Sequence, residues 1–294
     1  MDIADLRVFE AVSRLGSMNR AAQELHTVQS NVTARIRALE DELGVSLFHR
    51  HARGVTTTVA GQRMLPFVPR LTTLLAEARL AAQDDGTPSG ALSLGGLETT
   101  TALRLSPLLG RFARQHPAVR LVVTTGTTAH LVEEVLQCRL DGAFVAGPIQ
   151  HPDLVQEVMF REELVLVTAP GITAPTMLGE QAALATIVFQ LGCSYRLKLE
   201  ALLAGWGIVG TTPLAFGALD TILACVAAGV GVTLLPRGIV ARAVAEGQVA
   251  AHRLPARDAM TETVFLRRRD SYLSSALGAF LDLARRAEPL SAAA

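Results

Sequence analysis

Hydrogen-bonding side chains cluster in the segment "HTVQSNVTARIRALEDELG", residues 26–44. If this segment forms a helix, one face of it carries Ser30, Thr33 and Arg37, with Asn31 on the flank of that face and Gln29 at the amino end of the helix. Amide side chains can bind adenine through two hydrogen bonds, and an arginine can bind guanine or a phosphate. Small side chains beside them would let the helix lie deep in a major groove. The segment therefore predicts a surface that reads base pairs; the alternative is a solvated helix face.

A second group of polar residues lies where apolar runs end and helical patterns begin. These segments are ETTT (98–101), GTT (126–128) and QLGCSYR (190–196). Hydroxyls and free N–H groups at a helix start suit a carboxylate or another anion. Helix capping alone would explain one threonine per turn, but not several. We expect a site for a small organic anion, formed by Glu98, Thr99, Thr100, Thr101, Thr127, Thr128, Gln190, Cys193, Ser194 and Arg196.

Cys193 has two other possible roles. A thiol at a helix start has a stabilised thiolate and could act as a redox switch or as a nucleophile. A nucleophile needs a positioned histidine, and none of the seven histidines forms a motif with Cys193. The other cysteines, Cys138 and Cys225, are too distant for a disulfide framework or a zinc site. We therefore predict neither an enzyme nor a metal site, and redox sensing stays as the weaker alternative.

The overall composition is typical of a globular protein with two or three domains. The chain has 294 residues, of which 50% are hydrophobic, with 27 basic and 27 acidic side chains. No apolar run is long enough to cross a membrane, and no secretory signal pattern is present, so we expect a cytoplasmic location. Zero net charge leaves DNA binding open, because local charge matters more than the total. Residues 14–63 carry seven arginines and four acidic residues.

Short helices are expected throughout the first 44 residues. Apolar residues recur at a helical period over residues 3–15, and Gly16 ends that pattern. A second helix follows, capped by either Ser17 or Asn19. The third helix should bury a stripe formed by Val28, Val32, Ile36, Leu39 and Leu43. This stripe lies opposite the polar side chains, as a DNA-reading helix requires.

Further DNA contacts are expected around the third helix. Asn19 and Arg20 belong to the second helical segment. Arg35 lies about 60° from the apolar stripe of the third helix, so a phosphate contact and an ion pair within the protein are equal alternatives for it. The segment "SLFHRHARGVTTTVAG" predicts a two-stranded wing whose tip carries Arg53, and such a tip can contact phosphates or the minor groove. Glu24 and Glu40 are predicted to be structural charges.

A longer helix should follow over residues 58–82, after a capping threonine. Its apolar positions are Leu65, Val68, Leu71, Leu75 and Ala78. Polar partners are sparse, so this helix should bury one face against a second copy of itself. Pro66 and Pro69 remove backbone donors, and we therefore expect a kink or a broken start. The clearest linker is "DDGTPSG", residues 84–90.

Beyond the linker, short apolar runs alternate with helical patterns. This alternation predicts mostly parallel sheets with helices on both faces. Two such sets, separated near Pro170, predict two lobes with a cleft between them. Ligands in open α/β sheets bind beyond the carboxyl ends of strands, where the polar segments of the expected anion site lie.

The first 61 residues carry a specific combination of motifs. Residues 17–25 read S-M-x-x-AA-x-x-L, residues 39–50 read LE-x-x-LG-x-x-LF-x-R, and residues 53–61 read RG-V-x-x-T-x-AG. Together with a phenylalanine in the first helix and a third helix led by glutamine, they resemble the LysR-type transcriptional regulators. Val28 stands where the family usually has serine, and Ser30-Asn31 where it often has Pro-Ala or Pro-Thr. The docking mode can therefore be carried over, but the operator sequence cannot.

The rest of the chain resembles the family's inducer-binding domain, through segments such as "FREELVLVTAP" and "CVAAGVGVTLLP". This half is less specific, since periplasmic binding proteins share its two-lobed architecture, and a solute-binding module that ignores DNA is the alternative. The resemblance implies an α/β protein with a winged helix-turn-helix over residues 1–58, a linker and dimerisation helix with a hinge over 59–88, and a periplasmic-binding-protein-like effector domain over 89–294. The expected lobes span about 89–165 with 266–294, and 166–265.

The resemblance also implies a function and partners. The chain would be a sequence-specific DNA-binding regulator, and a small effector between the lobes would modulate its operator binding or transcription activation. No cofactor is expected apart from this effector. The implied partners are double-stranded DNA, a second copy bound through the linker helix, a further dimer in a tetramer, and RNA polymerase.

Overall fold

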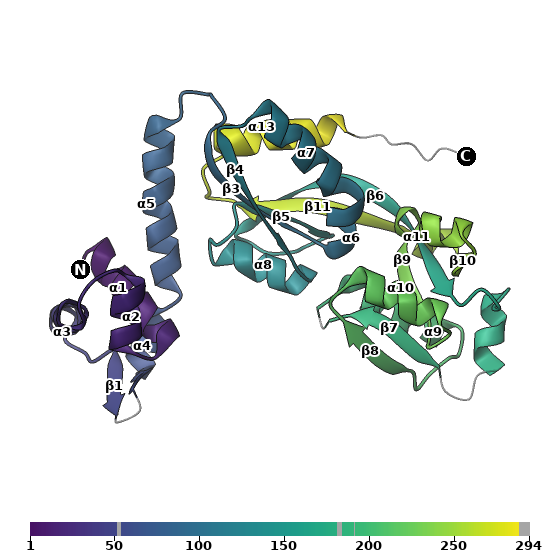
Figure 1. Cartoon of the computed structure of the whole chain (residues 1–294), viewed down its shortest axis with the longest axis horizontal. Helices are drawn as coiled ribbons and strands as arrows, with labels where there is room; N and C mark the ends of the chain where they lie inside the picture. Colours follow the sequence, from purple (N-terminus) through teal and green to yellow (C-terminus); the bar gives the residue numbers. More distant parts are fainter. Residues whose placement is uncertain (52–53, 181–183, 191, 288–294) are drawn as a thin grey trace. The chain divides into compact units, whose positions relative to one another are not determined.

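The computed structural model describes residues 1–51, 54–180, 184–190 and 192–287 of the chain. These residues form two compact units, Met1–Gln83 and Asp84–Ala294 (Figure 1). The long helix predicted over residues 58–82 belongs to the first unit, together with the predicted helix-turn-helix.

The first unit begins with helices and an antiparallel ribbon, which are α1 (Ile3–Leu15), α2 (Met18–Glu24), α3 (Gln29–Leu43), β1 (Phe48–His51) and β2 (Gly54–Thr57). Asp2 and Asp5 form a capping box at the start of α1, each side chain accepting the other's backbone N–H. Gly16 ends α1 in the left-handed region, with a φ of 62° that costs glycine little. Ser17, and not Asn19, caps α2 by accepting a backbone N–H from its first turn.

The helices of the first unit pack around one apolar core. Phe9 and Val12 of α1 are fully buried, and so are Val32 and Ile36 of α3. The ring of Phe9 also contacts Phe48 at the start of β1, with centroids 5.4 Å apart. Local patterning is thus sufficient to place the centre of the core.

The predicted apolar stripe of α3 is wrong at both ends. Val28 is 65% exposed and Leu43 is 39% exposed, whereas Leu39 is buried. Val28 is the N-cap residue, and its extended backbone (φ −94°, ψ 149°) turns it out of the helix. Leu43 occupies the last turn, where Gly44 ends the helix. A stripe predicted from residue spacing alone includes end residues that the neighbouring helices do not cover.

Glu40 fixes the connection between α3 and the ribbon. Its Oε1 accepts the backbone N–H groups of Leu47 at 2.7 Å and Phe48 at 3.2 Å. Glu24 forms an ion pair with Arg14 of α1. Both acidic side chains therefore have the structural roles that the sequence predicted.

The long helix has the broken start that its prolines predicted. Thr58 caps a short helix, α4 (Val59–Met64), by accepting the N–H of Gly61 at 3.1 Å. After Pro66 the chain continues as α5 (Phe67–Gln83). Val68 is buried in the core of the first unit, but Phe67 and much of the rest of α5 are exposed.

The main sheet of the second unit has, within the residues described, seven strands: β3 (Gly90–Gly96), β4 (Val119–Thr125), β5 (Gly142–Ala146), β6 (Leu154–Thr168), β9 (Thr233–Pro236), β10 (Ala250–Arg253) and β11 (Met260–Arg268). The order is β10-β6-β11-β5-β3-β4, and β9 also pairs with β6. Strand β3 is parallel to β4 and β5, as expected. The expectation of mostly parallel pairing is wrong for β6 and β11, which are antiparallel to their partners.

The two antiparallel strands connect two lobes. The first half of β6 pairs with β11 beside β5, and its second half pairs with β9 and β10. The chain crosses to the second lobe along β6 and returns along β11. The lobe boundaries expected near residues 165 and 266 fall within these crossing strands, whose length a strand–helix alternation does not reveal.

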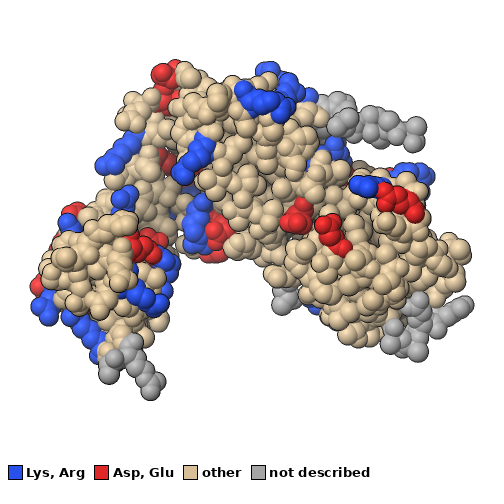
Figure 2. Space-filling model, viewed as in Figure 1, with Lys and Arg blue, Asp and Glu red and all other residues tan. Residues whose placement is uncertain are grey.

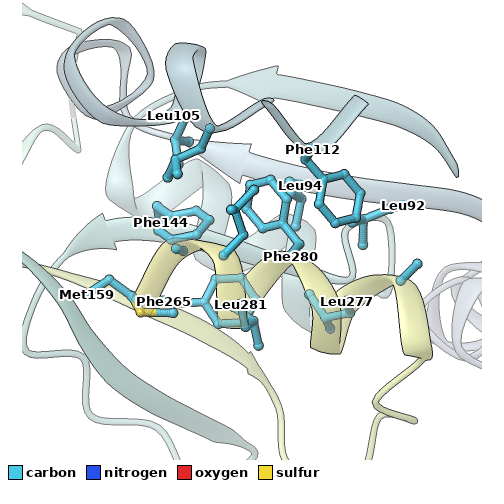
Figure 3. Packing of buried hydrophobic residues seen from close by; sticks show 14 of the residues in the cluster. Leu92, Leu94, Leu105, Phe112, Phe144, Met159, Phe265, Leu277, Phe280 and Leu281 are labelled. Carbon is cyan, nitrogen blue, oxygen red and sulfur yellow. The ribbon is translucent and has the colours of Figure 1, made fainter. Parts of the chain in front are cut away.

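The first lobe has an aromatic core beneath its helices, which are α6 (Glu98–Thr100), the π-helical turn η1 (Thr101–Leu105), α7 (Ser106–Gln115), α8 (Thr128–Leu136) and α13 (Ser275–Arg286). Figure 3 shows Phe112, Phe144 and Phe280 gathered between α13 and the sheet. The rings of Phe112 and Phe280 meet edge to face, with centroids 5.2 Å apart.

The second lobe has helices on both faces of its strands, as predicted. It contains η2 (Pro175–Glu180), β7 (Ala185–Phe189), α9 (Ser194–Gly205), β8 (Thr212–Phe216), α10 (Leu219–Ala227), α11 (Arg237–Ala245) and α12 (Ala256–Ala259). Successive residues of β6 enter different cores: Leu164 packs with Leu199 of α9, whereas Val165 packs with Ile222 of α10. Strands β7 and β8 are parallel, so their carboxyl ends meet at one edge.

Candidate nucleic-acid interface and ligand cavity

The polar face predicted on α3 is open to solvent. Its exposed members are Gln29, Ser30, Asn31 and Arg37, and Thr33 is half-buried. Asn31 donates a hydrogen bond to Thr27 Oγ1 at 2.9 Å, which fixes the orientation of its amide. Within the described residues, Arg37 has no ion-pair or hydrogen-bond partner. Its guanidinium is therefore free to bind a base edge or a phosphate.

Arg35 is held inside the first unit instead. Its Nη1 lies 2.8 Å from Asp5 Oδ1 and 3.5 Å from Asp2 Oδ1, at the start of α1. Of the two roles left open by the sequence, the intramolecular ion pair is the one observed. The pair joins residues 30 positions apart in the chain, which spacing within a single helix cannot reveal.

The remaining predicted DNA contacts lie around α3. Asn19 and Arg20 are exposed on α2, and the guanidinium of Arg20 donates to the carbonyl of Leu15. Arg53 lies outside the described residues. Arg50 of β1 is exposed, with its Nη2 3.9 Å from Glu40 Oε2. Figure 2 shows basic side chains around much of the visible surface of the first unit, with few acidic ones among them.

A cavity of about 240 Å³ lies between the two lobes of the second unit. The first lobe contributes residues 97–99, 125–127 and 146, and the second contributes residues 189–190, 193–195 and 216–217. These segments follow β3, β4, β5, β7 and β8, so the cavity lies beyond the carboxyl ends of parallel strands. This is where open α/β sheets bind ligands.

The polar groups of the cavity come from two helix starts. Thr127 caps α8, accepting the N–H of His130 at 3.3 Å. On the facing lobe, Cys193 is the N-cap of α9 and provides no side-chain cap. Ser194 Oγ donates to Thr128 Oγ1 at 3.3 Å, which joins the start of α9 to that of α8 across the cavity.

Six of the ten residues predicted for the anion site line the cavity: Glu98, Thr99, Thr127, Gln190, Cys193 and Ser194. Thr100 and Thr101 lie outside its lining, and the hydroxyl of Thr101 is buried without a hydrogen-bond partner among the described residues. Thr128 is also outside the lining but holds Ser194. The periodicity of a helix turns successive residues away from any one wall, so a run of threonines cannot all reach it.

Arg196, the predicted cation of the anion site, does not line the cavity. Its Nε lies 2.9 Å from Glu200 Oε1, one turn further along α9. The two residues stand four positions apart, a helical spacing that favours this pair. The sequence therefore predicted a positive charge in the anion site, but the described residues that line the cavity carry none.

The apolar part of the cavity was missed from the sequence. Leu97, Ala146, Phe189 and Phe216 line it, and so does Tyr195. Phe189 and Phe216 end the parallel strands β7 and β8 and are paired in register. An aromatic residue at the end of a strand and just before a glycine or polar run was the available signal, since this edge was already expected to bind a ligand.

Burial determines the protonation of the two titratable groups on α9 that face this region. It raises the pKa of the Cys193 thiol, although N–H groups of Arg196 and Tyr195 act in the opposite direction. It also raises the pKa of Tyr195 to about 12, and a hydrogen bond with Thr99 partly offsets this effect. Both groups are neutral at pH 7, and a protonated thiol is a poor nucleophile.

Two kinds of site are absent from the part of the chain that the structure describes. None of its helices is both long and apolar enough to span a membrane. No group of three or more histidine, cysteine, aspartate or glutamate side chains is arranged to hold a metal ion there.

Comparison with known proteins gives the family. Residues 3–62 match the model of the bacterial regulatory helix-turn-helix protein of the lysR family, and residues 85–289 match that of the LysR substrate binding domain. The chain belongs to the LysR family of transcriptional regulators. It is therefore a DNA-binding transcriptional regulator with a C-terminal effector-binding domain, and not an enzyme.

Several relatives match this LysR-family chain over nearly its whole length. The transcriptional regulator GltR of Bacillus subtilis is 40% identical over 96% of this chain and 95% of its own. The uncharacterised regulator YusT of the same organism is 42% identical over the same shares. SoxR of an Arthrobacter species is 37% identical over 98% of each chain.

Solved structures of full-length regulators share the fold. CbnR in complex with its target DNA has a TM-score of 0.68 and 25% identity, covering 97% of this chain and 99% of its own. Full-length OxyR of Pseudomonas aeruginosa has a TM-score of 0.69, covering 97% and 98%, at 21% identity. At that identity the likeness to OxyR extends to the fold alone.

Proposed function

We propose that this LysR-family regulator reads its operator through α3 and changes its activity when a small molecule fills the cavity between its lobes. The observation that carries the proposal is that Ser194 Oγ donates a hydrogen bond to Thr128 Oγ1 at 3.3 Å beside this cavity and so joins the two lobes. A ligand that inserts beside this contact binds both lobes. It thereby shifts the population of lobe arrangements, a change that needs no chemical step.

The effector is proposed to be a small polar molecule with an acidic group. The start of α9 offers backbone N–H groups that its N-cap side chain leaves uncapped, and the amide of Gln190 has no hydrogen-bond partner among the described residues. Such donors suit a carboxylate. Leu97, Phe189 and Phe216 would cover its apolar part.

The regulator is proposed to act as an oligomer in the cytoplasm. Exposed apolar side chains on α5, including Phe67, Leu71 and Leu74, support a dimer through this helix. Two α3 helices of a dimer could then enter successive major grooves, about 34 Å apart. A tetramer and a contact with RNA polymerase are further expectations from the family. The full-length CbnR that resembles this chain was solved with its target DNA.

The DNA-reading role can be tested by comparing two arginines of the same helix. Arg37→Ala should weaken specific binding about 5- to 150-fold, because a good base contact contributes roughly 1–3 kcal/mol. Arg35→Ala is the matched control: it should reduce thermal stability by separating α3 from α1, with a smaller effect on DNA affinity. Electrophoretic mobility shift titrations at several salt concentrations measure both effects. Equal losses of affinity in the two variants would contradict the assignment.

The effector role can be tested by filling the cavity. Gly217 lines it, and among the described residues an added Cβ there would meet only Gln190 Nε2, at 3.7 Å, so its backbone accepts a side chain and Gly217→Leu should fold. This variant should bind operator DNA and lose its response to the inducing compound in a reporter assay. Gly171→Leu is the control, since Gly171 is exposed and has open space around its Cα. A normal response of Gly217→Leu would place the effector elsewhere.

A further inference from the structure

We propose that the effector of this regulator carries a protonated amine, and that the carboxylate of Glu98 binds this amine in the cavity between the lobes. The inference rests on the proposed function, because it concerns the same cavity. It narrows the ligand from a small organic anion to a zwitterion of amino-acid size, with its acidic group at the start of α9 and its amine at the opposite wall.

The charge of the cavity lining carries the argument. Glu98 is the one carboxylic-acid side chain among the described residues of that lining, which contain no arginine, lysine or histidine. Arg196, the nearest cation expected from the sequence, is already paired with Glu200. Tyr195 and Cys193 are neutral at pH 7, as shown above. A purely anionic ligand would therefore meet an uncompensated negative charge, which repels it.

The side chain of Glu98 also has no polar partner among the residues that the structure describes. The residue is half-buried, and its side chain makes no ion pair or hydrogen bond with any other described residue. The neighbouring acidic residues of β6 are different: Glu162 lies 2.5 Å from Arg104, and Glu163 lies 3.1 Å from Arg237. A partly buried charge without a partner is unfavourable, and an ammonium group from a ligand would supply the missing partner.

A structural explanation for Glu98 makes a different prediction. An acidic residue in the first turn of a helix is favoured by the helix dipole, and Glu98 begins α6. Asp220 occupies the same kind of position in the first turn of α10 and is exposed outside the cavity. If Glu98 served only to interact with the helix dipole, neutralising Glu98 and neutralising Asp220 would have the same effect on ligand binding. The two residues therefore form a matched pair for an experiment.

The size and walls of the cavity limit the rest of the ligand. Its volume of about 240 Å³ is below the roughly 300–1,000 Å³ of cavities for drug-sized molecules. Leu97, Phe189 and Phe216 provide apolar surface between the charged wall and the start of α9. An amino acid with an apolar or short polar side chain has the required combination of amine, acid and size.

The test uses the full-length protein and sets of compounds that differ only in their charged groups. One set is L-phenylalanine, 3-phenylpropanoate and 2-phenylethylamine; others are L-leucine with 4-methylpentanoate and 3-methylbutylamine, and L-glutamate with glutarate and 4-aminobutanoate. Thermal shift at millimolar ligand, followed by calorimetry, ranks each set. We expect amine-bearing members to stabilise the protein and the matched carboxylates to fail.

Substitution of Glu98 then identifies the group that recognises the amine. Glu98→Gln should lower the affinity for an amine-bearing compound at least about tenfold, since a charge-assisted hydrogen bond is lost. It should also abolish the preference over the matched carboxylate. Asp220→Asn should bind each compound as the wild type does.

Three results would overturn the inference. The first is a carboxylate without an amine that binds as tightly as its amino acid. The second is an unchanged amine affinity in Glu98→Gln, and the third is failure of every amine-bearing compound to bind. A failure of the proposed function would give a different result. An amine-bearing compound would then bind Gly217→Leu and the wild type equally well, which would place the binding site outside the cavity independently of the result for Glu98→Gln.

Discussion

Arg35 and Arg37 stand two positions apart on α3 and have different environments. Arg37 is exposed and has no partner among the described residues, while Arg35 binds Asp5 at 2.8 Å. The sequence identified both as candidate DNA contacts: Arg37 because it lies opposite the apolar stripe, and Arg35 with an ion pair inside the protein as an equal alternative. The difference between the two arginines depends on Asp5, which belongs to another helix. Only the packing of α1 against α3 brings the Asp5 carboxylate within reach of Arg35.

Tertiary packing also decides the chemistry of Cys193, whose position at a helix start suggested a reactive thiolate. Burial raises the pKa of this thiol, so the thiolate fraction is lower than that of an ordinary cysteine at every pH near neutrality. Alkylation of Cys193 by iodoacetamide should consequently begin at a higher pH than that of Cys225, which is only partly buried. Peptide mass spectrometry over a pH series measures both rates. Fastest labelling of Cys193 at pH 7 would restore redox sensing as a function.

At the scale of single elements, the sequence largely predicted where the helices begin and end, but it did not predict which of their residues are exposed to solvent. Gly16 and Gly44 end α1 and α3 in left-handed conformations, which their sequence context indicated. The break at Pro66 was expected for a similar local reason. Val28, by contrast, was assigned to a buried stripe because only its spacing was considered, although it lies before the helix and faces solvent.

Val28 offers an element-scale prediction. It is the N-cap of α3 in an extended conformation and makes no side-chain cap, so the first N–H groups of α3 lack a side-chain acceptor. Val28→Ser should supply that acceptor and stabilise the first unit by about 1 kcal/mol. Val28→Ala removes the same exposed side chain without adding an acceptor, and it should give no such gain. Thermal unfolding without DNA compares the three proteins, and equal melting temperatures for serine and alanine would contradict the capping argument.

At the scale of the whole molecule, the sequence predicted the two-part organisation but missed the way the lobes are joined. Strand–helix alternation indicated parallel sheets because β3 and β4 are each followed by helices that lead to the next strand. The crossing strands β6 and β11 pair antiparallel over residues distant in the chain, from Leu154 with Arg268 to Glu163 with Met260. Such non-local pairing has no local signature.

The exposed apolar residues of α5 predict that the whole chain forms a dimer through this helix. Leu71 and Leu74 are 41% and 60% exposed on this helix, and exposed apolar side chains in such a row favour contact with another chain. Leu71→Glu combined with Leu74→Glu should give a species that sediments more slowly than the wild type, because burying two carboxylates in a dimer contact is unfavourable. Operator affinity should fall by about 10²–10⁴, the range in which two linked binding modules exceed one. Gln83→Glu, which adds a carboxylate at the exposed end of α5, is the control and should leave both properties unchanged. Sedimentation velocity and mobility shift titration provide the two measurements, and an unchanged sedimentation coefficient in the double variant would exclude α5 as the dimer contact.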